Sequence, residues 1–301
     1  MSTAQPVVAV VGATATGKSD LALELAQSLG GELVNADSMQ LYRGMDIGTA
    51  KTPRGQRRGI IHHQIDVLDV TQDASVAAYQ TSARADVAAI ASRGAAAIIV
   101  GGSGLYVRAL LDDMAFPATD PHLRAELEQR LQQQGPGILH HELAQRDPAA
   151  AARIDRRNGR RVVRALEVVL LTGAPFAAAL PDRRTPVIPA IQIAIEVPRP
   201  ELAQRIAARA GAMFADGLVQ ETRALLDAGL DQGVTARRAV GYAQARAVLA
   251  GDLDIPAAVE ATTVATRQLA RRQLTWFRRD ERVHWLPPGP DLLARALRLV
   301  S

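Results

Sequence analysis

The strongest chemical signal in the chain is an eight-residue stretch, Gly12-Ala13-Thr14-Ala15-Thr16-Gly17-Lys18-Ser19. It fits the phosphate-binding loop pattern G-x-x-x-x-G-K-[ST], in which glycines let backbone N–H groups close around a di- or triphosphate. In that pattern Lys18 brings an ammonium group to the outer phosphate, and Ser19 brings a hydroxyl to Mg²⁺. The sequence therefore predicts a site for a phosphorylated ligand and a magnesium ion, with ATP as the usual ligand of such loops.

The residues on either side have the patterns needed to position this loop. The apolar run 7–11 predicts a buried strand, and apolar residues recur at helical spacing in 21–29. The new helix would point its positive N-terminal end at the ligand. A glycine-rich turn that only joins a strand to a helix is the alternative, but the order of strand, loop and helix favours a phosphate site.

Lysine is rare in this chain, which gives its presence in the loop more weight. Of the 35 basic residues, two are lysines, Lys18 and Lys51, which leaves 33 arginines. A genome biased toward arginine codons explains most of this excess. Against that background, a lysine at the position that needs a compact ammonium supports the assignment.

A second group of polar residues, Asp37-Ser38-Met39-Gln40, follows a short predicted strand at 32–36. In open α/β sheets ligands bind beyond the carboxyl ends of the strands, so we expect Asp37 to face the same crevice as the phosphate loop. The alternative is an aspartate that only caps a helix or a turn. A further buried strand at 95–100 ends in the turn Gly101-Gly102-Ser103-Gly104, which we expect at the same edge of the sheet.

Between these groups the signals are weaker. Residues 41–60 predict a functional or flexible loop, and 60–67 a third strand containing His62 and His63. The two histidines lack a recognisable third metal ligand, so we expect a structural pair. A helix is predicted at 79–91.

The predicted secondary structure changes after Leu111, from alternating strands and helices to helices alone. Residues 115–121 predict a linker, and 122–171 a helical segment broken at 134–137 and near 158–159. A proline-bearing stretch at 180–189 closes this segment. The sequence then predicts a strand at 190–197, helices at 200–215, 219–228, 237–250 and 256–279, a strand at 283–286 and a closing helix at 292–300.

The predicted fold is thus α/β, a P-loop NTPase-like parallel sheet flanked by helices, with an all-helical insertion domain. Residues 1–114 and 186–301 would form the catalytic core, and 115–185 the insertion.

Two clusters of arginine could bind a polyanion. Six arginines fall within residues 153–164, where Asp155 is the one acidic residue; the alternative is a solvated helix face. In the long helix at 256–279, Arg272, Trp276 and Arg279 share one face, which would suit base stacking and phosphate contacts. The alternative there is a tryptophan in the core with arginines extending around it.

Composition sets broad limits on the function. The 301 residues are 48% hydrophobic, contain no cysteine and show no run long enough to span a membrane, so disulfides and thiolate metal sites are excluded. The N-terminus lacks the pattern of a signal peptide, and we expect a cytoplasmic protein without membrane contact. A net charge of +4 suits a polyanionic partner without requiring one.

Six motifs together carry a resemblance to one known family. They are GATATGKS at 12–19, NADSMQLYRGMDIGTAK at 35–51, GGSGLY at 101–106, RALEV at 164–168, VGY at 240–242 and TRQLARRQLTWFR at 266–278. In these motifs the chain resembles tRNA dimethylallyltransferases over nearly its whole length.

The resemblance implies transfer of a dimethylallyl group from dimethylallyl diphosphate to N6 of the adenosine next to the anticodon on its 3′ side. The loop from Gly12 to Ser19 would then hold this donor, rather than ATP, with Mg²⁺ on Ser19. Asp37 would be the general base, and Lys18, Ser103 and Arg223 would also be catalytic.

By the same resemblance the insertion clamps the anticodon arm. We expect a monomer on the tRNA, because the sequence leaves no long apolar face without a partner. The residues implied to contact the tRNA are Asp37, Ser38, Met39, Gln40, Ser103, Arg124, Arg160, Arg161, Val162, Val163, Arg164, Arg238, Gly241, Tyr242, Arg271, Arg272, Gln273, Trp276 and Arg278.

Two other functions are compatible with the residues alone. A small-molecule kinase could use the same loop and aspartate for a hydroxyl acceptor, although it would not need so many arginines. A non-catalytic nucleic-acid-binding protein could use a bound nucleotide as a switch.

Overall fold

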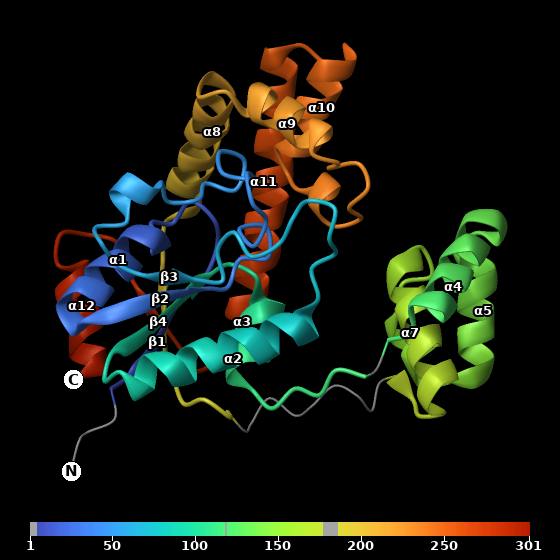
Figure 1. Cartoon of the computed structure of the whole chain (residues 1–301), viewed down its shortest axis with the longest axis horizontal. Helices are drawn as coiled ribbons and strands as arrows, with labels where there is room; N and C mark the ends of the chain where they lie inside the picture. The colour runs from blue at the N-terminus through green and yellow to red at the C-terminus, as the bar shows by residue number, and fades with distance from the viewer. Residues whose placement is uncertain (1–4, 118, 177–185) are drawn as a thin grey trace. The chain divides into compact units, whose positions relative to one another are not determined.

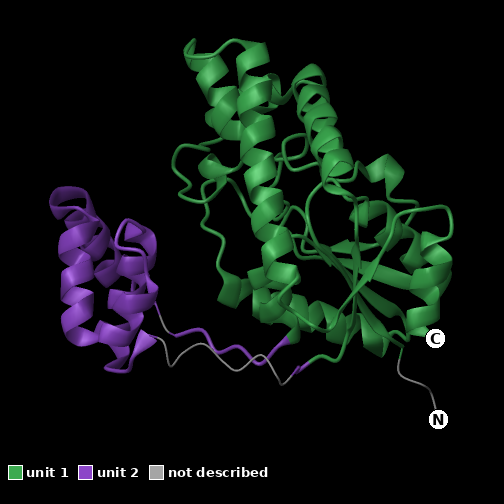
Figure 2. Cartoon of the chain, turned by 180° about the vertical axis from the view of Figure 1, so that it is seen from behind, with its two compact units in different colours: residues 1–111, 188–301 green, residues 112–187 purple. Residues whose placement is uncertain are grey.

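A computed structural model describes residues 5–117, 119–176 and 186–301 of the chain. The chain divides into two compact units, the first formed by residues 1–111 and 188–301 and the second by residues 112–187 (Figure 2). The predicted insertion spans 115–185; its residues 118 and 177–185, with parts of the expected linker and of the proline-bearing stretch, lie outside the described residues.

The first unit is built on a six-stranded sheet in which every pairing is parallel (Figure 1). The strand order is β3 (His62–His63), β2 (Gly31–Asn35), β4 (Ala96–Gly101), β1 (Val7–Val11), β5 (Ile191–Ile195) and β6 (Val283–Leu286). The central strands are almost continuously apolar because helices cover both faces of the sheet. The parallel α/β fold predicted from the sequence is therefore confirmed.

Helices on the two faces bury alternate side chains of the strands. Helices α1 (Lys18–Leu29) and α12 (Leu292–Val300) pack with Ile98 on one face. Helices α2 (Val76–Ser92) and α3 (Gly104–Leu111) pack with Ile99 on the other. This alternation follows from the two-residue period of a strand, and it leaves the carboxyl ends of the strands free to form a site.

Four further helices extend the first unit beyond the sheet. They are α8 (Arg199–Ala215), α9 (Leu218–Asp227), α10 (Tyr242–Ala250) and α11 (Ile255–Phe277). Their core includes Tyr42 and Met45, which come from the loop after β2. The loop that follows Asp37 is thus anchored in this helical layer.

The second unit is a small helical bundle. Its helices are α4 (Pro121–Gln134), α5 (Pro136–Arg146), α6 (Pro148–Arg153) and α7 (Gly159–Thr172). The side chains of Asp120, Asp147 and Asn158 accept backbone N–H groups at the starts of α4, α6 and α7. The core includes Leu127, Leu139, Leu143 and Leu166.

Two predicted elements are wrong in extent. The strand expected at 60–67 pairs only over β3, because Gln64 and Asp66 take positive φ angles of 57° and 58° that end the extended chain. The helix expected at 237–250 begins only at Tyr242. Residues Ala236–Arg238 form a 3₁₀ turn, and Gly241 at φ 92° separates it from α10.

Within the described residues, no helix combines the length and apolar character needed to cross a membrane.

Candidate active site

The phosphate loop links β1 to α1 at the carboxyl edge of the sheet. Gly12 at φ 121° and Gly17 at φ 93° occupy conformations that a side chain would strain. Ala13 and Ala15 are buried against residues of α8 and α11, including Ile206. The loop is therefore shaped by its glycines and held by packing, with the N-terminus of α1 directed into it.

The loop opens on a cavity of about 600 Å³ within the first unit. Its wall includes residues from the phosphate loop, the turn after β2, the loop before β3, α8 and α11, namely Thr14, Gly17, Lys18, Ser19, Asp37, Lys51, Arg209 and Gln273. This volume falls in the range of ordinary small-ligand sites.

Lys18 lies in this cavity, and its ammonium donates to the Ala13 carbonyl. Burial lowers the pKa of Lys18 to about 8; attraction to Asp37 opposes this, and Arg209 reinforces it. A bound anion would place negative charge next to the Lys18 ammonium and stabilise its protonated form, so the site favours a polyphosphate.

Asp37 is held at the end of β2 by the buried side chain of Asn35. The Asp37 N–H donates to Asn35 Oδ1 at 2.9 Å, and Asn35 Nδ2 donates to the carbonyls of Asp37 and Gln64, each at 2.9 Å. Burial raises the pKa of Asp37, while the Met39 N–H, at 3.0 Å from Oδ1, and the Lys18 charge oppose that rise. A carboxylate with a raised pKa and a fixed position is suited to accept a proton.

The turns after β2 and β4 meet, as their glycines and polar residues predicted. The Ser38 N–H donates to Ser103 Oγ at 3.1 Å, and the two hydroxyls lie 3.3 Å apart. The prediction that both turns lie at one edge of the sheet is confirmed by the pairing of Asn35 with Val100.

A second cavity of about 290 Å³ lies beside the first and shares part of its wall. The residues common to both are Thr14, Asp37, Thr49, Ala50, Arg209 and Gln273. The second cavity adds apolar side chains such as Met213 and Leu269, and the cations Arg238 and Arg272. Asp37 thus borders two spaces, one next to the phosphate loop and one lined by apolar groups and arginines.

Gln273 lines both cavities and is fixed by two hydrogen bonds to other segments. It is 9% exposed; its Oε1 accepts the Thr14 N–H at 2.9 Å, and its Nε2 donates to the Gly102 carbonyl at 3.0 Å. It therefore joins α11 to the phosphate loop and to the turn after β4.

Other residues expected to contact tRNA are buried in the folded chain. Val162 and Val163 are 0% and 2% exposed, and their side chains pack in the core of the second unit. Tyr242 is 0% exposed, and its hydroxyl donates a hydrogen bond to Glu221 Oε1. Gly241, the preceding residue, is also buried. The tRNA contacts that the resemblance implies for these four residues stay predictions; in the structure their side chains or backbone are part of the interior.

Trp276 is half-buried in the first unit, and its expected stacking on a base stays a prediction. It packs against the hydrophobic core on one side of the sheet, and its ring lies so close to Gly104 that a side chain there would overlap it. Its neighbours on α11, Arg271, Arg272 and Arg278, are exposed. Arg278 also lies 5.4 Å from the ring centre of Trp285 and 3.1 Å from Glu196.

The arginines of the second unit divide into two groups. Arg160 and Arg161 are exposed. Arg124 and Arg164 bind the fully buried carboxylate of Glu167, with Arg164 at 2.6 Å, and their charges hold the pKa of Glu167 below its usual value against the effect of burial. Arg124 and Arg164 thus have a structural role within this unit.

Arg223, which the resemblance implies to be catalytic, is exposed on α9 and lines neither cavity. Arg209 of α8 lines both cavities, with a guanidinium nitrogen 3.4 Å from Thr14 Oγ1, and burial lowers its pKa. Sequence reasoning missed Arg209, because its spacing from Arg205 is that of any amphipathic helix.

The parallel sheet, the glycine-bounded loop after β1 and the cavity beyond the strand ends define an α/β enzyme of the phosphate-loop fold. The IPP transferase family model matches residues 40–280, and the chain belongs to this family. The small-molecule kinase alternative is not favoured.

Named relatives agree with this assignment. The chain is 58% identical to a tRNA dimethylallyltransferase of Mycobacterium sp. (strain KMS), over 97% of each chain. It is 56% identical to one from Streptomyces coelicolor, over 100% of this chain and 98% of the relative. It also resembles the solved tRNA isopentenylpyrophosphate transferase of Bacillus halodurans, with a TM-score of 0.70 and 35% identity over 98% and 97% of the two chains.

Proposed function

We propose that this protein transfers the dimethylallyl group of dimethylallyl diphosphate to N6 of the adenosine 3′-adjacent to the anticodon in tRNA. The product would be N6-isopentenyladenosine. The observation that carries this proposal is the position of Asp37, which borders both the cavity at the phosphate loop and the second, arginine-lined cavity. A base at that boundary can act on an acceptor in one space while a donor occupies the other.

The first cavity suits the diphosphate of the donor. Lys18, Arg209 and the N–H groups of the phosphate loop converge on it, and each can stabilise negative charge on a departing diphosphate. Ser19 would hold Mg²⁺ together with phosphate oxygens of the donor, since Mg²⁺ prefers such hard oxygen ligands. When bound, the ion would add positive charge beside the leaving group.

The second cavity suits the allylic group and the adenine. Its apolar residues match a five-carbon chain and an aromatic base, while Arg238 and Arg272 can meet the phosphates around an extruded nucleotide. Removing a base from its stack costs a few kcal/mol, least in a loop, and backbone contacts from arginine can offset this.

The reaction then needs one proton transfer. The C1–O bond of the donor breaks, the bond between N6 and C1 forms, and diphosphate leaves with the electron pair. Asp37 accepts a proton from N6 as the new bond forms, which balances the charge on the nitrogen.

The direct test is to incubate the protein with tRNA and dimethylallyl diphosphate and to analyse digested nucleosides by mass spectrometry. We expect adenosine to gain one five-carbon unit, with no gain when ATP replaces the donor. Binding of tRNA without any mass gain would leave a non-catalytic nucleic-acid-binding protein. Tight calorimetric binding of ATP with no response to the prenyl donor would support a kinase.

A further inference from the structure

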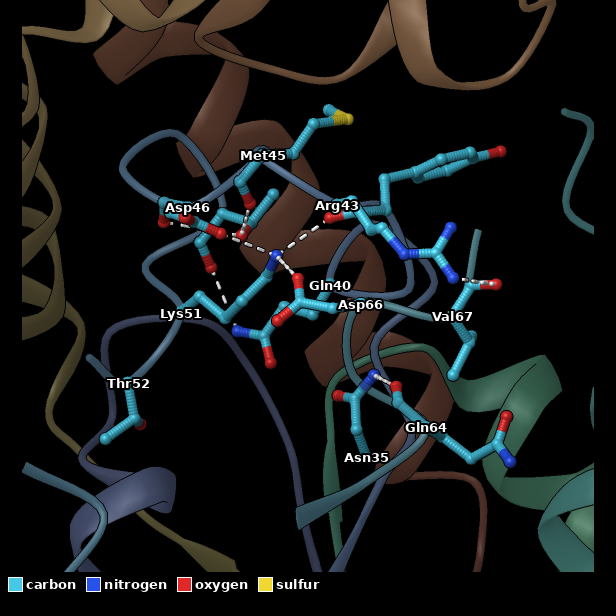
Figure 3. Close-up of polar contacts among 12 residues, drawn as sticks. Asn35, Gln40, Arg43, Met45, Asp46, Lys51, Thr52, Gln64, Asp66 and Val67 are labelled. Atoms are coloured by element: carbon cyan, nitrogen blue, oxygen red, sulfur yellow. Dashed lines mark hydrogen bonds and ion pairs between the residues drawn. The ribbon is translucent and has the colours of Figure 1, made fainter. Parts of the chain in front are cut away.

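The loop between β2 and α2 encloses a buried ammonium group to which the proposed chemistry assigns no role. The side chain of Lys51 is 2% exposed. Its Nζ donates to Asp66 Oδ1 at 2.6 Å, Asp46 Oδ1 at 2.7 Å and the Tyr42 carbonyl at 2.8 Å (Figure 3). Figure 3 shows the three oxygens converging on the end of the lysine side chain.

Three acceptors match the chemistry of an ammonium group. Lysine has three N–H donors on one nitrogen, and here each has an oxygen partner. Arginine has five donors in a planar fork and would not fit the same set of oxygens. This explains why Lys51 is one of only two lysines in a chain with 33 arginines.

The three partners lie far apart along the loop. Tyr42, Asp46 and Asp66 span 25 residues of chain, so a single ammonium closes the loop on itself. The Lys51 N–H also donates to the Asp46 carbonyl at 3.0 Å. Asp66 has a positive φ of 58°, an unfavourable conformation for a non-glycine residue that its contact with Lys51 helps to hold.

The loop closed in this way forms part of the active-site wall. Thr49 and Ala50, directly before Lys51, line both cavities, and Gln40 Nε2 binds the Thr49 carbonyl at 3.0 Å. Lys51 itself lines only the first cavity of the two. Contacts that hold Thr49 and Ala50 in place therefore also hold the wall shared by the two cavities that Asp37 borders.

We propose that Lys51 is a positioning residue that holds the Thr49–Ala50 wall in register with Asp37, so that donor and acceptor meet in the reactive geometry. This rests on the proposed function. The competing role is a second phosphate-binding lysine, which its place in the donor cavity would also allow. The contacts favour positioning, because all three N–H donors are already engaged within the loop.

The two roles differ in the kinetic constant that they affect. A positioning residue should change kcat, because an error of about 1 Å in geometry can slow a reaction roughly 100-fold. A phosphate ligand should instead raise the KM for the donor. We expect Lys51→Met to lower kcat about 10- to 100-fold while the donor KM changes less than about threefold. Lys51→Arg should not restore kcat.

The matched control is Arg54→Met, which removes an exposed cation from the same loop. It should leave both constants within about twofold of the unmodified protein. Hydrogen exchange gives a readout that needs no substrate: Lys51→Met should raise deuterium uptake across residues 42–66, and Arg54→Met should not.

Asp66→Asn keeps the shape of the partner but removes its charge, so it serves if Lys51→Met does not fold. We expect a smaller fall in kcat, about three- to tenfold, again with a near-constant donor KM. An unchanged kcat in either folded variant, or a rise in donor KM at constant kcat, would overturn the inference. Failure of the unmodified protein to transfer the prenyl group would instead overturn the proposed function.

Discussion

The side chains of Asp37 and Lys18 line the same cavity, and each opposes the pKa shift that burial causes in the other. Burial raises the pKa of the acid and lowers that of the amine, so both shifts favour the neutral forms. Mutual attraction favours the charged forms. Burial and mutual attraction thus act in opposite directions on both the base and the anion-binding group.

The first prediction is a bell-shaped dependence of kcat/KM for the donor on pH. The rate should rise as Asp37 ionises at its raised pKa and fall as Lys18 loses its proton near pH about 8. In the pH profile of kcat this fall should occur at a higher pH than in the profile of kcat/KM, because a bound diphosphate stabilises the ammonium. Steady-state assays from pH 5 to 10 measure both profiles, and a flat profile across pH 8 would contradict this role for Lys18.

The second prediction is that Lys18→Met stabilises the fold while it abolishes donor binding. The folded pKa of about 8 lies below the ordinary lysine pKa of 10.5, so the folded state binds fewer protons between these values. The free energy of unfolding should rise with pH across this window, and at pH 7 the full penalty is present. Removing the charge should add on the order of 1 to 2 kcal/mol, less than the full shift implies because the side chain is partly exposed.

Urea unfolding at pH 7 without ligands measures this effect, with calorimetry for donor binding. Lys51→Met is the matched control, since it removes the other lysine from a site where two carboxylates balance it. It should lower the free energy of unfolding. If both variants lowered the free energy of unfolding, burial of the Lys18 charge would not be destabilising the folded protein.

The third prediction concerns the base. Asp37→Ala should slow single-turnover transfer by about 100-fold or more and leave the tRNA Kd within about threefold. Asp37→Asn should behave similarly, because an amide cannot accept the proton. Asp227→Asn, an exposed change on α9, should have no effect. A normal single-turnover rate in either Asp37 variant would exclude the carboxylate as base.

The fourth prediction separates two arginines. Arg209→Ala should raise the donor KM about 10- to 100-fold, because it removes a partly desolvated guanidinium that lines both cavities. Arg223→Ala should change the KM by less than about twofold, since Arg223 is exposed and lines neither cavity. The reverse order of effects would show that Arg223, and not Arg209, acts on the donor.

The fifth prediction concerns α7 of the second unit. Arg160→Ala and Arg161→Ala should each reduce the salt dependence of tRNA binding by roughly one unit of slope without affecting stability, as exposed phosphate contacts do. Val163→Ala should instead lower the free energy of unfolding by about 1 to 3 kcal/mol. Titrations at several salt concentrations, paired with thermal unfolding, distinguish the two. Equal salt slopes for all variants would place the tRNA elsewhere.

The sequence by itself determined the phosphate loop, the central strands and the family. Gly12 and Gly17 are required by the positive φ angles of the local backbone. The apolar composition of β1 is enough to predict that this strand is buried. These signals are read over a few residues, so they do not depend on distant contacts.

Only the tertiary structure decided how individual polar side chains are used. Gln273 and Thr14 are 259 positions apart in sequence yet share a hydrogen bond, and no local pattern predicts that pairing. In sequence Arg209 and Arg223 carry the same charge on similar helices, but folding places one, partly buried, beside the phosphate loop and leaves the other in solvent. Burial and pairing are properties of residues brought together by the fold, and they separate a ligand-binding arginine from a surface one.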